Sequence, residues 1–206
     1  MAERLKNPMQ QRAQETRKKI LAAAVSVYSR KGLNGATVDD IAEAAGVNKQ
    51  RLYAYFGSKK RLFEAALLDV FQQVELFSVS TVKRAAAHPE NLTDILLRGF
   101  IRVHAAHPAF WRLLAWANLE GGDCVHVLDQ ARKAENEALR TIFEQATAAG
   151  VIPNIRFETY LFSLLAVSFF YYSNRLTLSH TLDVNLTSTE WREALCRDLN
   201  SVYTQG

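Results

Sequence analysis

Residues 37–56 read TVDDIAEAAGVNKQRLYAYF and predict two short helices joined by a tight turn. Thr37, followed three residues later by Asp40, resembles a capping box in which Asp replaces the usual Glu or Gln, so a helix should begin there. Gly46 is able to take the positive φ that a tight turn needs. Asn48 then predicts the start of a second helix, because Asn is a favoured N-cap residue. The segment is therefore expected to fold as helix, turn and helix.

Apolar residues at the right positions let these two helices pack against each other. Ile41, Val47 and Leu52 supply the contacts, and the small Ala42 permits a close approach. Helices of about eight residues joined so tightly fit a helix-turn-helix better than a hairpin of a helical bundle. In such a motif the second helix enters the major groove of DNA, with its N-terminal residues toward the base edges.

The stretch AAGVNKQRLYAYFGSKKRLFEAAL, residues 44–67, resembles the signature of the TetR family of transcriptional regulators, and the resemblance extends over about residues 16–68. It implies an all-α fold. An N-terminal three-helix helix-turn-helix domain would bind DNA, and a C-terminal helical domain would bind an effector and form a dimer. We expect the first domain to cover residues 1–61 and the second to cover residues 62–206.

Apolar periodicity and the positions of Gly and Pro predict nine helices. Gly32 should close the first helix, and Thr187 with Glu190 should open the last as a capping box. The expected ranges are about 11–30, 37–45, 48–56, 58–87, 92–107, 109–119, 125–149, 156–178 and 187–203.

The net charge of +4 conceals an uneven distribution along the chain. Residues 1–61 hold 13 Lys/Arg and 5 Asp/Glu, a net charge of +8, whereas residues 62–206 hold 12 and 16, a net charge of −4. A basic first third joined to a mildly acidic remainder indicates that only the first part meets a polyanion. Double-stranded DNA is the expected partner, and two recognition helices in a dimer would require a near-palindromic operator.

Base contacts are expected from the exposed arcs of the second short helix. Leu52 and Phe56 lie four residues apart and should face the core, so other positions remain for DNA. Gln can bond adenine, Arg or Lys can pair with guanine, and Ala can touch a thymine methyl group. This reasoning selects Lys49, Gln50, Arg51 and Ala54. Arg51 departs from the small or hydroxyl residue usual in the family; it would contact a guanine or a phosphate, or else remain a solvated side chain.

Phosphate contacts come from the family resemblance and from the basic N-terminal stretch. The resemblance implies that Thr37, Tyr53 and Lys59 lie where phosphate contacts are common and that Tyr55 lies where an aromatic residue or His is usual. All four would position the protein on the DNA. Arg12, Arg17, Lys18 and Lys19 form a basic run that is either a solvated helix face or a contact surface for DNA. We expect at least one of Arg17 and Lys18 to contact DNA.

A helix that is apolar nearly all round predicts a second copy of the chain. From Leu161 to Tyr172 no residue is charged, so more than one side of that helix should be buried. The last helix carries a matching apolar stripe, and the family resemblance implies a four-helix dimer interface built from residues near 156–178 and 188–203. The stripe consists of Trp191, Leu195, Leu199 and Val202.

Two stretches, HPAFWRLLAWANLEGG at 107–122 and FFYYSNRLTLS at 169–179, resemble the regulatory domains of one TetR subgroup. Aromatic rings with a few polar groups suit a small aromatic or carboxylated effector, although each is also compatible with an ordinary core position. An effector-responsive regulator predicts a cavity of a few hundred Å³ among these rings, and an effector-independent DNA binder predicts a filled core. The candidate ligand residues are Phe100, His104, His107, Phe110, Trp111, Trp116, Asn118, Phe169, Tyr172, Asn174 and Arg175.

Other classes of function receive little support from the sequence. The chain has no P-loop, G-x-S-x-G, HExxH or paired Cys/His ligand set, so an enzyme would rest on His104 near Glu120 or Asp123. His104 and His107 have a metal-compatible spacing but lack further ligands nearby, so we expect no metal or cofactor. Cys124 and Cys196 are expected to be buried free thiols.

The location expected from the sequence is the cytoplasm. The charged N-terminus lacks the apolar stretch of a signal peptide. The twelve uncharged residues of the most apolar segment fall short of the roughly 20 that span a bilayer. Taken together, the sequence predicts a ligand-responsive, dimeric, DNA-binding regulator, with repression favoured over activation.

Overall fold

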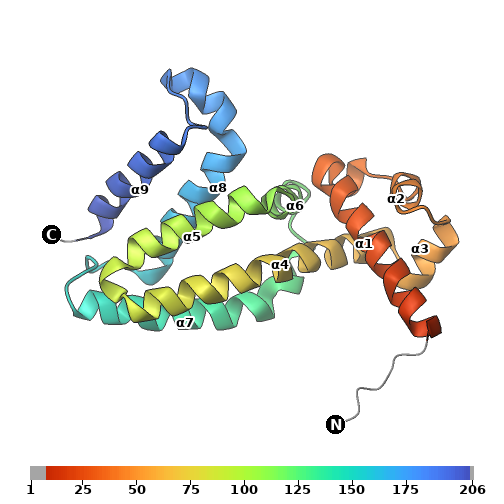
Figure 1. Cartoon of the computed structure of the whole chain (residues 1–206), viewed down its shortest axis with the longest axis horizontal. Helices are drawn as coiled ribbons and strands as arrows, with labels where there is room; N and C mark the ends of the chain where they lie inside the picture. The colour runs from red at the N-terminus through yellow and green to blue at the C-terminus, as the bar shows by residue number, and fades with distance from the viewer. Residues whose placement is uncertain (1–7, 205–206) are drawn as a thin grey trace, which may run out of the picture. The chain divides into compact units, whose positions relative to one another are not determined.

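The computed structural model describes residues 8–204, except for the side chains of residues 75–78 and 131. In this part of the chain all regular secondary structure is helical, as the sequence predicts (Figure 1). The absence of a signal peptide was inferred partly from residues 1–7, which lie outside the described residues. The elements are α1 (Pro8–Gly35), α2 (Val38–Ala45), α3 (Lys49–Phe56), α4 (Lys59–Ala87), η1 (Pro89–Asn91), α5 (Leu92–Ala106), α6 (Pro108–Leu119), η2 (Val125–Leu128), α7 (Asp129–Ala148), α8 (Phe157–Leu182) and α9 (Thr189–Tyr203).

The chain divides into two compact units. The first contains residues up to Gln72 together with Arg112–Leu128, and the second contains Gln73–Trp111 and the residues from Asp129 onward. The division falls within α4 and α6, so each of these helices begins in one unit and ends in the other. The domain boundary expected after Arg61 stays a prediction, because the units follow contacts in space rather than chain order.

The helix-turn-helix predicted from local signals is confirmed. Asp40 N–H donates to Thr37 Oγ1 at 3.1 Å, and Thr37 N–H donates to Asp40 Oδ2 at 2.9 Å, so both halves of the capping box are present. Gly46 ends α2 with φ 63° and ψ 37°, which is the left-handed conformation. Asn48 Oδ1 accepts from Arg51 N–H at 2.8 Å and begins α3. Ser58 Oγ does the same for Arg61 N–H, at 3.1 Å, where α4 begins.

The core of the first unit lies where α1, α2 and the start of α4 meet. Ile41 of α2 and Leu52 of α3 are fully buried, as the inter-helix packing predicted. Tyr28 of α1 is also fully buried; its ring meets Phe63 edge to face at 5.0 Å, and its hydroxyl donates to the Lys59 carbonyl at 2.9 Å. The hydroxyl bond ties α1 to the first turn of α4.

In the second unit α5 packs against α7, α8 and α9. Apolar side chains on α5 are shared between two clusters. Leu92, Ile95 and Leu96 meet α7 and the first half of α8 in what we call the α5–α7–α8 cluster. Leu97 and Ile101 meet the second half of α8 and α9 in the α5–α8–α9 cluster. Arg98, beside Leu97, bonds Asp94 Oδ1 at 2.7 Å and Glu193 Oε2 at 2.6 Å, which joins α5 to α9 by charge as well.

Several helix limits differ from the expected ones. Helix α1 begins at Pro8, earlier than expected; Gly32 interrupts it with a non-helical φ of 71°, as predicted for a helix-ending glycine, and a short helical stretch then continues to Gly35. Helix α8 continues to Leu182, because Asp183, rather than Leu178, takes the left-handed end position with φ 51°. Residues Val125–Leu128 form the separate turn η2, so α7 begins four residues later than predicted.

The capping box predicted at Thr187 and Glu190 is wrong. Ser188 begins α9, because its Oγ accepts from Trp191 N–H at 3.1 Å. The Thr187 hydroxyl instead donates to Asn185 Oδ1 at 2.6 Å, within the turn that precedes the helix. Thr187 and Ser188 are adjacent hydroxyl residues, and either could cap the helix. Because the Thr187 hydroxyl is bonded to Asn185 in the turn, Ser188 is the residue that caps α9.

Candidate nucleic-acid interface and effector site

The surface of α3 carries the side chains that the sequence assigns to DNA. Leu52 and Phe56 are 0% and 7% exposed and hold the helix on its unit. The opposite arcs of the helix are open to solvent; the large side chain of Tyr53, for example, is 45% exposed. Tyr55 lies half-buried at the edge of these arcs. The exposed residues are Lys49, Gln50, Arg51, Tyr53 and Ala54.

Two basic residues near this surface already have contacts within the protein. Lys49 Nζ lies 2.6 Å from Asp39 Oδ2, an ion pair between α3 and α2. The guanidinium of Arg17 lies 5.1 Å from the ring centroid of Phe56, so α1 and the end of α3 are linked by a cation–π contact. Lys18 is exposed and Lys59 half-buried. A phosphate group would therefore compete with Asp39 for Lys49, whereas it would find Lys18 exposed to solvent.

Thr37 caps α2 and is also a predicted phosphate contact. Its hydroxyl is engaged as the cap of α2, yet the residue is exposed. Asp40, which completes the cap, accepts from Thr37 N–H and lies 3.0 Å from Lys31 Nζ. The hydrogen bond from the Thr37 backbone, aided by Lys31, lowers the pKa of Asp40 from 3.8 to about 2. The carboxylate that fixes the start of α2 is thus ionised throughout the physiological range.

In the second unit, three predicted ligand residues meet around a fourth, His104. This side chain is 6% exposed, and its ring lies 6.2 Å from Phe110, 6.2 Å from Phe169 and 5.9 Å from Tyr172, measured between centroids. Burial lowers the pKa of His104 to about 4, so the ring is neutral at physiological pH. We call His104, Phe110, Phe169 and Tyr172 the aromatic cluster.

Two polar atoms of the aromatic cluster are left without a hydrogen-bond partner among the described residues. These are His104 Nδ1 and the Tyr172 hydroxyl oxygen, both buried. Such atoms are uncommon in folded proteins and point to a bound molecule or water. The Arg175 guanidinium lies over the ring of Tyr172, 4.9 Å from its centroid, and adds a positive charge at the edge of the cluster.

The other predicted ligand residues lie in varied surroundings. Phe100 packs at the edge of the α5–α7–α8 cluster and Trp111 at the edge of the α5–α8–α9 cluster. The backbone N–H of His107 ends α5 on the Val103 carbonyl at 2.9 Å, and the Asn174 side chain donates to the Phe170 carbonyl at 3.3 Å.

Trp116 and Asn118 belong to the first unit, unlike the aromatic cluster. Trp116 packs on Gly32 of α1, and the exposed Asn118 bonds the Leu114 carbonyl at 2.8 Å. Sequence proximity to Phe110 therefore does not bring these two residues into the same compact unit.

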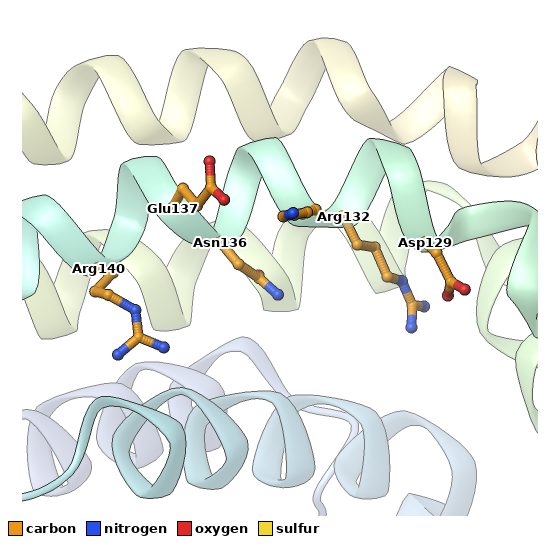
Figure 2. Close-up of a pocket in the computed structure, with 6 residues that line it drawn as sticks. Asp129, Arg132, Asn136, Glu137 and Arg140 are labelled. Atoms are coloured by element: carbon orange, nitrogen blue, oxygen red, sulfur yellow. The ribbon is translucent and has the colours of Figure 1, made fainter.

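A depression of about 510 Å³ lies along α7 and is lined only by residues of that helix (Figure 2). Figure 2 shows Asn136 and Arg140 on one side of α7 and Glu137 on the other. Arg140 bonds Glu158 Oε1 at 2.6 Å and lies over the ring of Phe157. None of the predicted ligand residues lines this hollow, so the aromatic cavity stays a prediction. The lining residues are Asp129, Arg132, Lys133, Asn136, Glu137 and Arg140.

Helix α8 exposes large apolar side chains, as a dimer surface would. Phe162 is 72% exposed, Phe170 is 53% exposed and Leu176 is 70% exposed, and Leu165 lies between them. On α9, Val202 is 65% exposed, while Trp191, Leu195 and Leu199 pack against the α5–α8–α9 cluster. The apolar stripe predicted on α9 is therefore turned largely inward, and α8 supplies most of the exposed apolar surface.

The described residues contain neither a metal-site grouping nor a helix that could span a membrane. Across them, no three His, Cys, Asp or Glu side chains gather as a metal site would require, and no helix has the length and apolarity to cross a bilayer. Both cysteines are free and buried, as predicted. Glu120 and Asp123, which an enzyme would have paired with His104, are engaged by α1 backbone amides and by Lys60 respectively.

Glu120 is a residue whose role the sequence did not reveal. Its carboxylate accepts hydrogen bonds from the backbone of α1, more than eighty residues earlier in the chain. The Gly121–Gly122 pair after α6 marked the end of a helix, but no local signal indicated a partner for the preceding carboxylate.

Comparison with known proteins gives consistent matches over both units. Residues 20–66 match the family described as "Bacterial regulatory proteins, tetR family", and residues 89–200 match "Tetracyclin repressor-like, C-terminal domain". The chain is 33% identical over 187 residues to the HTH-type transcriptional repressor NicS of Pseudomonas putida, which covers 87% of this chain and 86% of that protein. It is 36% identical over 107 residues to the HTH-type transcriptional repressor SCO4008 of Streptomyces coelicolor, 52% of each chain.

Solved structures show the same fold. A TetR family transcription regulator from Marinobacter aquaeolei VT8 superposes with a TM-score of 0.72 at 21% identity, over 96% of this chain and 100% of that one. PfmR from Thermus thermophilus, a TetR family transcriptional regulator, gives a TM-score of 0.67 at 17% identity over 89% and 95%. With a helix-turn-helix whose α3 surface is exposed, and with family matches across both units, the chain belongs to the TetR family of bacterial transcriptional regulators.

Proposed function

We propose that this protein is a dimeric repressor that leaves a near-palindromic operator when a small molecule binds in its second unit. The observation that carries the DNA-binding part is the exposed surface of α3. Arg51 and Gln50 are exposed there, on a helix whose start is fixed by Asn48 and whose buried face is held by Leu52 and Phe56. Side chains of this kind read guanine and adenine edges in the major groove.

The names of the relatives support repression. NicS and SCO4008 are both described as transcriptional repressors, and the first is similar to this chain over most of its length. In a repressor of this kind Arg17, Lys18, Tyr53 and Lys59 would hold phosphates, together with the exposed Thr37. DNA binding would also place the protein in the cytoplasm, where a bacterial chromosome is found.

Dimerisation is supported by the exposed apolar face of α8. A helix that leaves Phe162, Phe170 and Leu176 open to water gains by burying them against a second copy. A two-fold symmetric pair would also present two α3 helices to two half-sites about one turn of DNA apart, roughly 34 Å. We therefore assign α8, with the exposed end of α9, to the dimer interface.

The aromatic cluster is the proposed effector site. Aromatic walls from Phe110 and Phe169 suit a planar ligand, and neutral His104 and the Tyr172 hydroxyl can each exchange a hydrogen bond with it. Arg175 would accommodate a carboxylate at the edge of the cluster. An aromatic or carboxylated small molecule fits this chemistry. Release from DNA requires that the effector bind the DNA-incompetent state more tightly than the competent one.

Selection of bound sequences from a random DNA pool tests the first part of the proposal. A two-fold symmetric consensus with fixed spacing is the expected result. A single asymmetric site, or no enrichment, would contradict it.

The effector part is tested on the selected operator. Its affinity should be measured with and without a panel of aromatic acids and their uncharged analogues. An active compound should lose its effect in Tyr172→Phe, which removes one hydroxyl from the cluster, and keep it in Tyr203→Phe. Operator affinity unchanged by any compound that demonstrably binds the second unit would favour the alternative, an effector-independent DNA binder.

A further inference from the structure

The end of α6 is attached to α1 by one carboxylate. Glu120 Oε2 accepts from Leu33 N–H at 3.0 Å, and Glu120 Oε1 accepts from Asn34 N–H at 3.0 Å. All these residues belong to the first unit. A carboxylate that receives two neighbouring amides makes a pair of charge-assisted bonds with fixed geometry. We call Glu120 with the amides of Leu33 and Asn34 the Glu120 latch.

Gly32 provides the space that the latch needs. Its φ of 71° with ψ −178° is a conformation that favours glycine, and it turns the chain just before the two bonded amides. A Cβ atom at this position would lie 2.6 Å from Glu120 Oε1 and 2.7 Å from Trp116 Cε3. Trp116 and Glu120 are four residues apart, so one face of α6 is seated on this turn.

The latch lies at the base of the helix-turn-helix. Asn34 is three residues before Thr37, which caps α2, and the Gly32 carbonyl accepts from Ala36 N–H at 3.3 Å between them. A second, weaker link lies nearby, because Lys60 Nζ is 3.8 Å from Asp123 Oδ2 in the turn after α6. Both side chains of that pair are more than half exposed, so its contribution is small.

We propose that Glu120 is a positioning residue that sets the direction of the helix-turn-helix relative to α6, and thereby the spacing at which a dimer grips its two half-sites. This inference rests on the proposed function, since it assumes a dimer on two half-sites. Helix α6 begins at Pro108, next to Phe110 of the aromatic cluster, and reaches the latch about ten residues and 15 Å later.

Replacement of Glu120 by Gln tests the proposal with little change of shape. A Gln side chain has one acceptor oxygen, and its NH₂ group would face an N–H group, so one of the two bonds is lost. Asp123→Asn is the matched control, because it removes one negative charge three residues away without touching the latch. Each protein is titrated with the selected operator, with versions whose spacer is one base pair shorter or longer, and with an isolated half-site.

The expected result is a loss of spacing preference. Wild type and Asp123→Asn should bind the selected spacing about tenfold or more tightly than either altered spacing, because the DNA-binding units of both copies must contact their half-sites at the same time. Glu120→Gln should discriminate by about threefold or less, with half-site affinity within about twofold of wild type. Hydrogen exchange at the Leu33 and Asn34 amides should accelerate in Glu120→Gln alone.

Three results would overturn the proposal in different ways. Spacing preference retained by Glu120→Gln would contradict the latch alone. A fall in half-site affinity as large as the fall for the full operator would show that Glu120 merely supports the fold of the DNA-binding unit. A wild type without spacing preference would contradict the dimeric operator reading, and the latch with it.

A second pair of variants guards against a fold defect in Glu120→Gln. Gly32→Ala places a Cβ against Glu120 and Trp116, whereas Gly150→Ala introduces alanine at a similar φ, 73°, with no atom within 4 Å of the new Cβ. Gly32→Ala should lose spacing preference, and Gly150→Ala should keep it. Equal behaviour of the two alanine variants would contradict a role for the latch.

Discussion

The two units of the chain differ in how their polar groups are satisfied. In the first unit α2, α3 and α4 each begin on a side chain that accepts from the backbone, at Thr37, Asn48 and Ser58, and Glu120 receives two further amides. In the second unit His104 Nδ1, Thr147 Oγ1 and the Tyr172 hydroxyl are buried without a hydrogen-bond partner among the described residues. No buried side-chain polar atom without a hydrogen-bond partner is found among the described residues of the first unit.

The second unit contains two kinds of group without a partner in the single chain, buried polar atoms and exposed apolar side chains. Its buried unpaired atoms call for a polar ligand or water, since a buried polar group without a partner costs about 1–3 kcal/mol. Its exposed apolar side chains on α8 call for a protein surface. Under the proposed function, DNA recognition would be preformed on α3, whereas regulation would depend on groups of the second unit that have no partner within the single chain.

The strongest test of this contrast is a charge on the apolar face of α8. Leu176→Asp places a carboxylate where a second copy should pack, so the protein should become monomeric. Affinity for the full operator should then fall by about 10²–10⁴-fold, because the two DNA-binding units are no longer linked. Affinity for an isolated half-site should be kept.

The oligomeric state should be measured by sedimentation and the affinity by titration. Val79→Asp, at another exposed apolar position, on α4 and 46% exposed, is the control and should remain dimeric. A dimeric Leu176→Asp would contradict the assignment of α8 to the dimer interface.

A smaller effect is expected from the titration of His104. The native state resists protonation because burial holds the pKa of His104 near 4, whereas the unfolded chain takes up the proton near 6.5. Stability should therefore fall as the pH drops from 6.5 to 4, by up to about 3 kcal/mol. His104→Phe lacks this proton, so its free energy of unfolding should decline less over that window.

Denaturant unfolding at several pH values measures the difference. His180→Gln, at an exposed position on α8, is the control for the loss of one imidazole elsewhere in the chain. If His104→Phe lost stability as steeply as the wild type between pH 6.5 and 4, the buried state of His104 would not be the cause.

The smallest expected effect distinguishes two basic residues of α3. Arg51→Ala should either weaken discrimination at one base pair by about tenfold or lower the slope of log affinity against log salt by about one. Lys49→Ala should cost less, about threefold or below, because Lys49 must first leave Asp39. Titration at several salt concentrations measures both. No change in either quantity for Arg51→Ala would identify Arg51 as a solvated side chain.

Local signals were enough to predict the DNA-reading part of the molecule. Thr37, Gly46 and Asn48 act on atoms within a few residues, so their positions in the chain predict the caps and the turn. The same kind of signal misplaced the start of α9 by choosing Thr187 instead of Ser188, because the residue already engaged by Asn185 cannot be recognised from spacing alone.

Long-range contacts could not be predicted in this way. Glu120 meets Leu33 across 87 positions, and no periodicity connects the two. The aromatic residues of the second unit could be named as candidates, but only the packing selects Phe110, Phe169 and Tyr172 around His104 and separates Trp116 from them. Such contacts form only where two helices cross at a particular place and angle. Composition and hydrophobic pattern do not predict where that crossing lies.

The turn between α8 and α9 is held before any second copy arrives. The Tyr171 hydroxyl donates to the Leu186 carbonyl at 2.6 Å, and Leu186 N–H donates to Ser179 Oγ at 3.2 Å. These bonds are present in the single chain, so association with a second copy would not have to carry the entropy of ordering the turn. In the proposed dimer, two such hairpins would meet as preformed bodies, and the affinity of the pair would then depend on the apolar face of α8 rather than on any rearrangement of the turn.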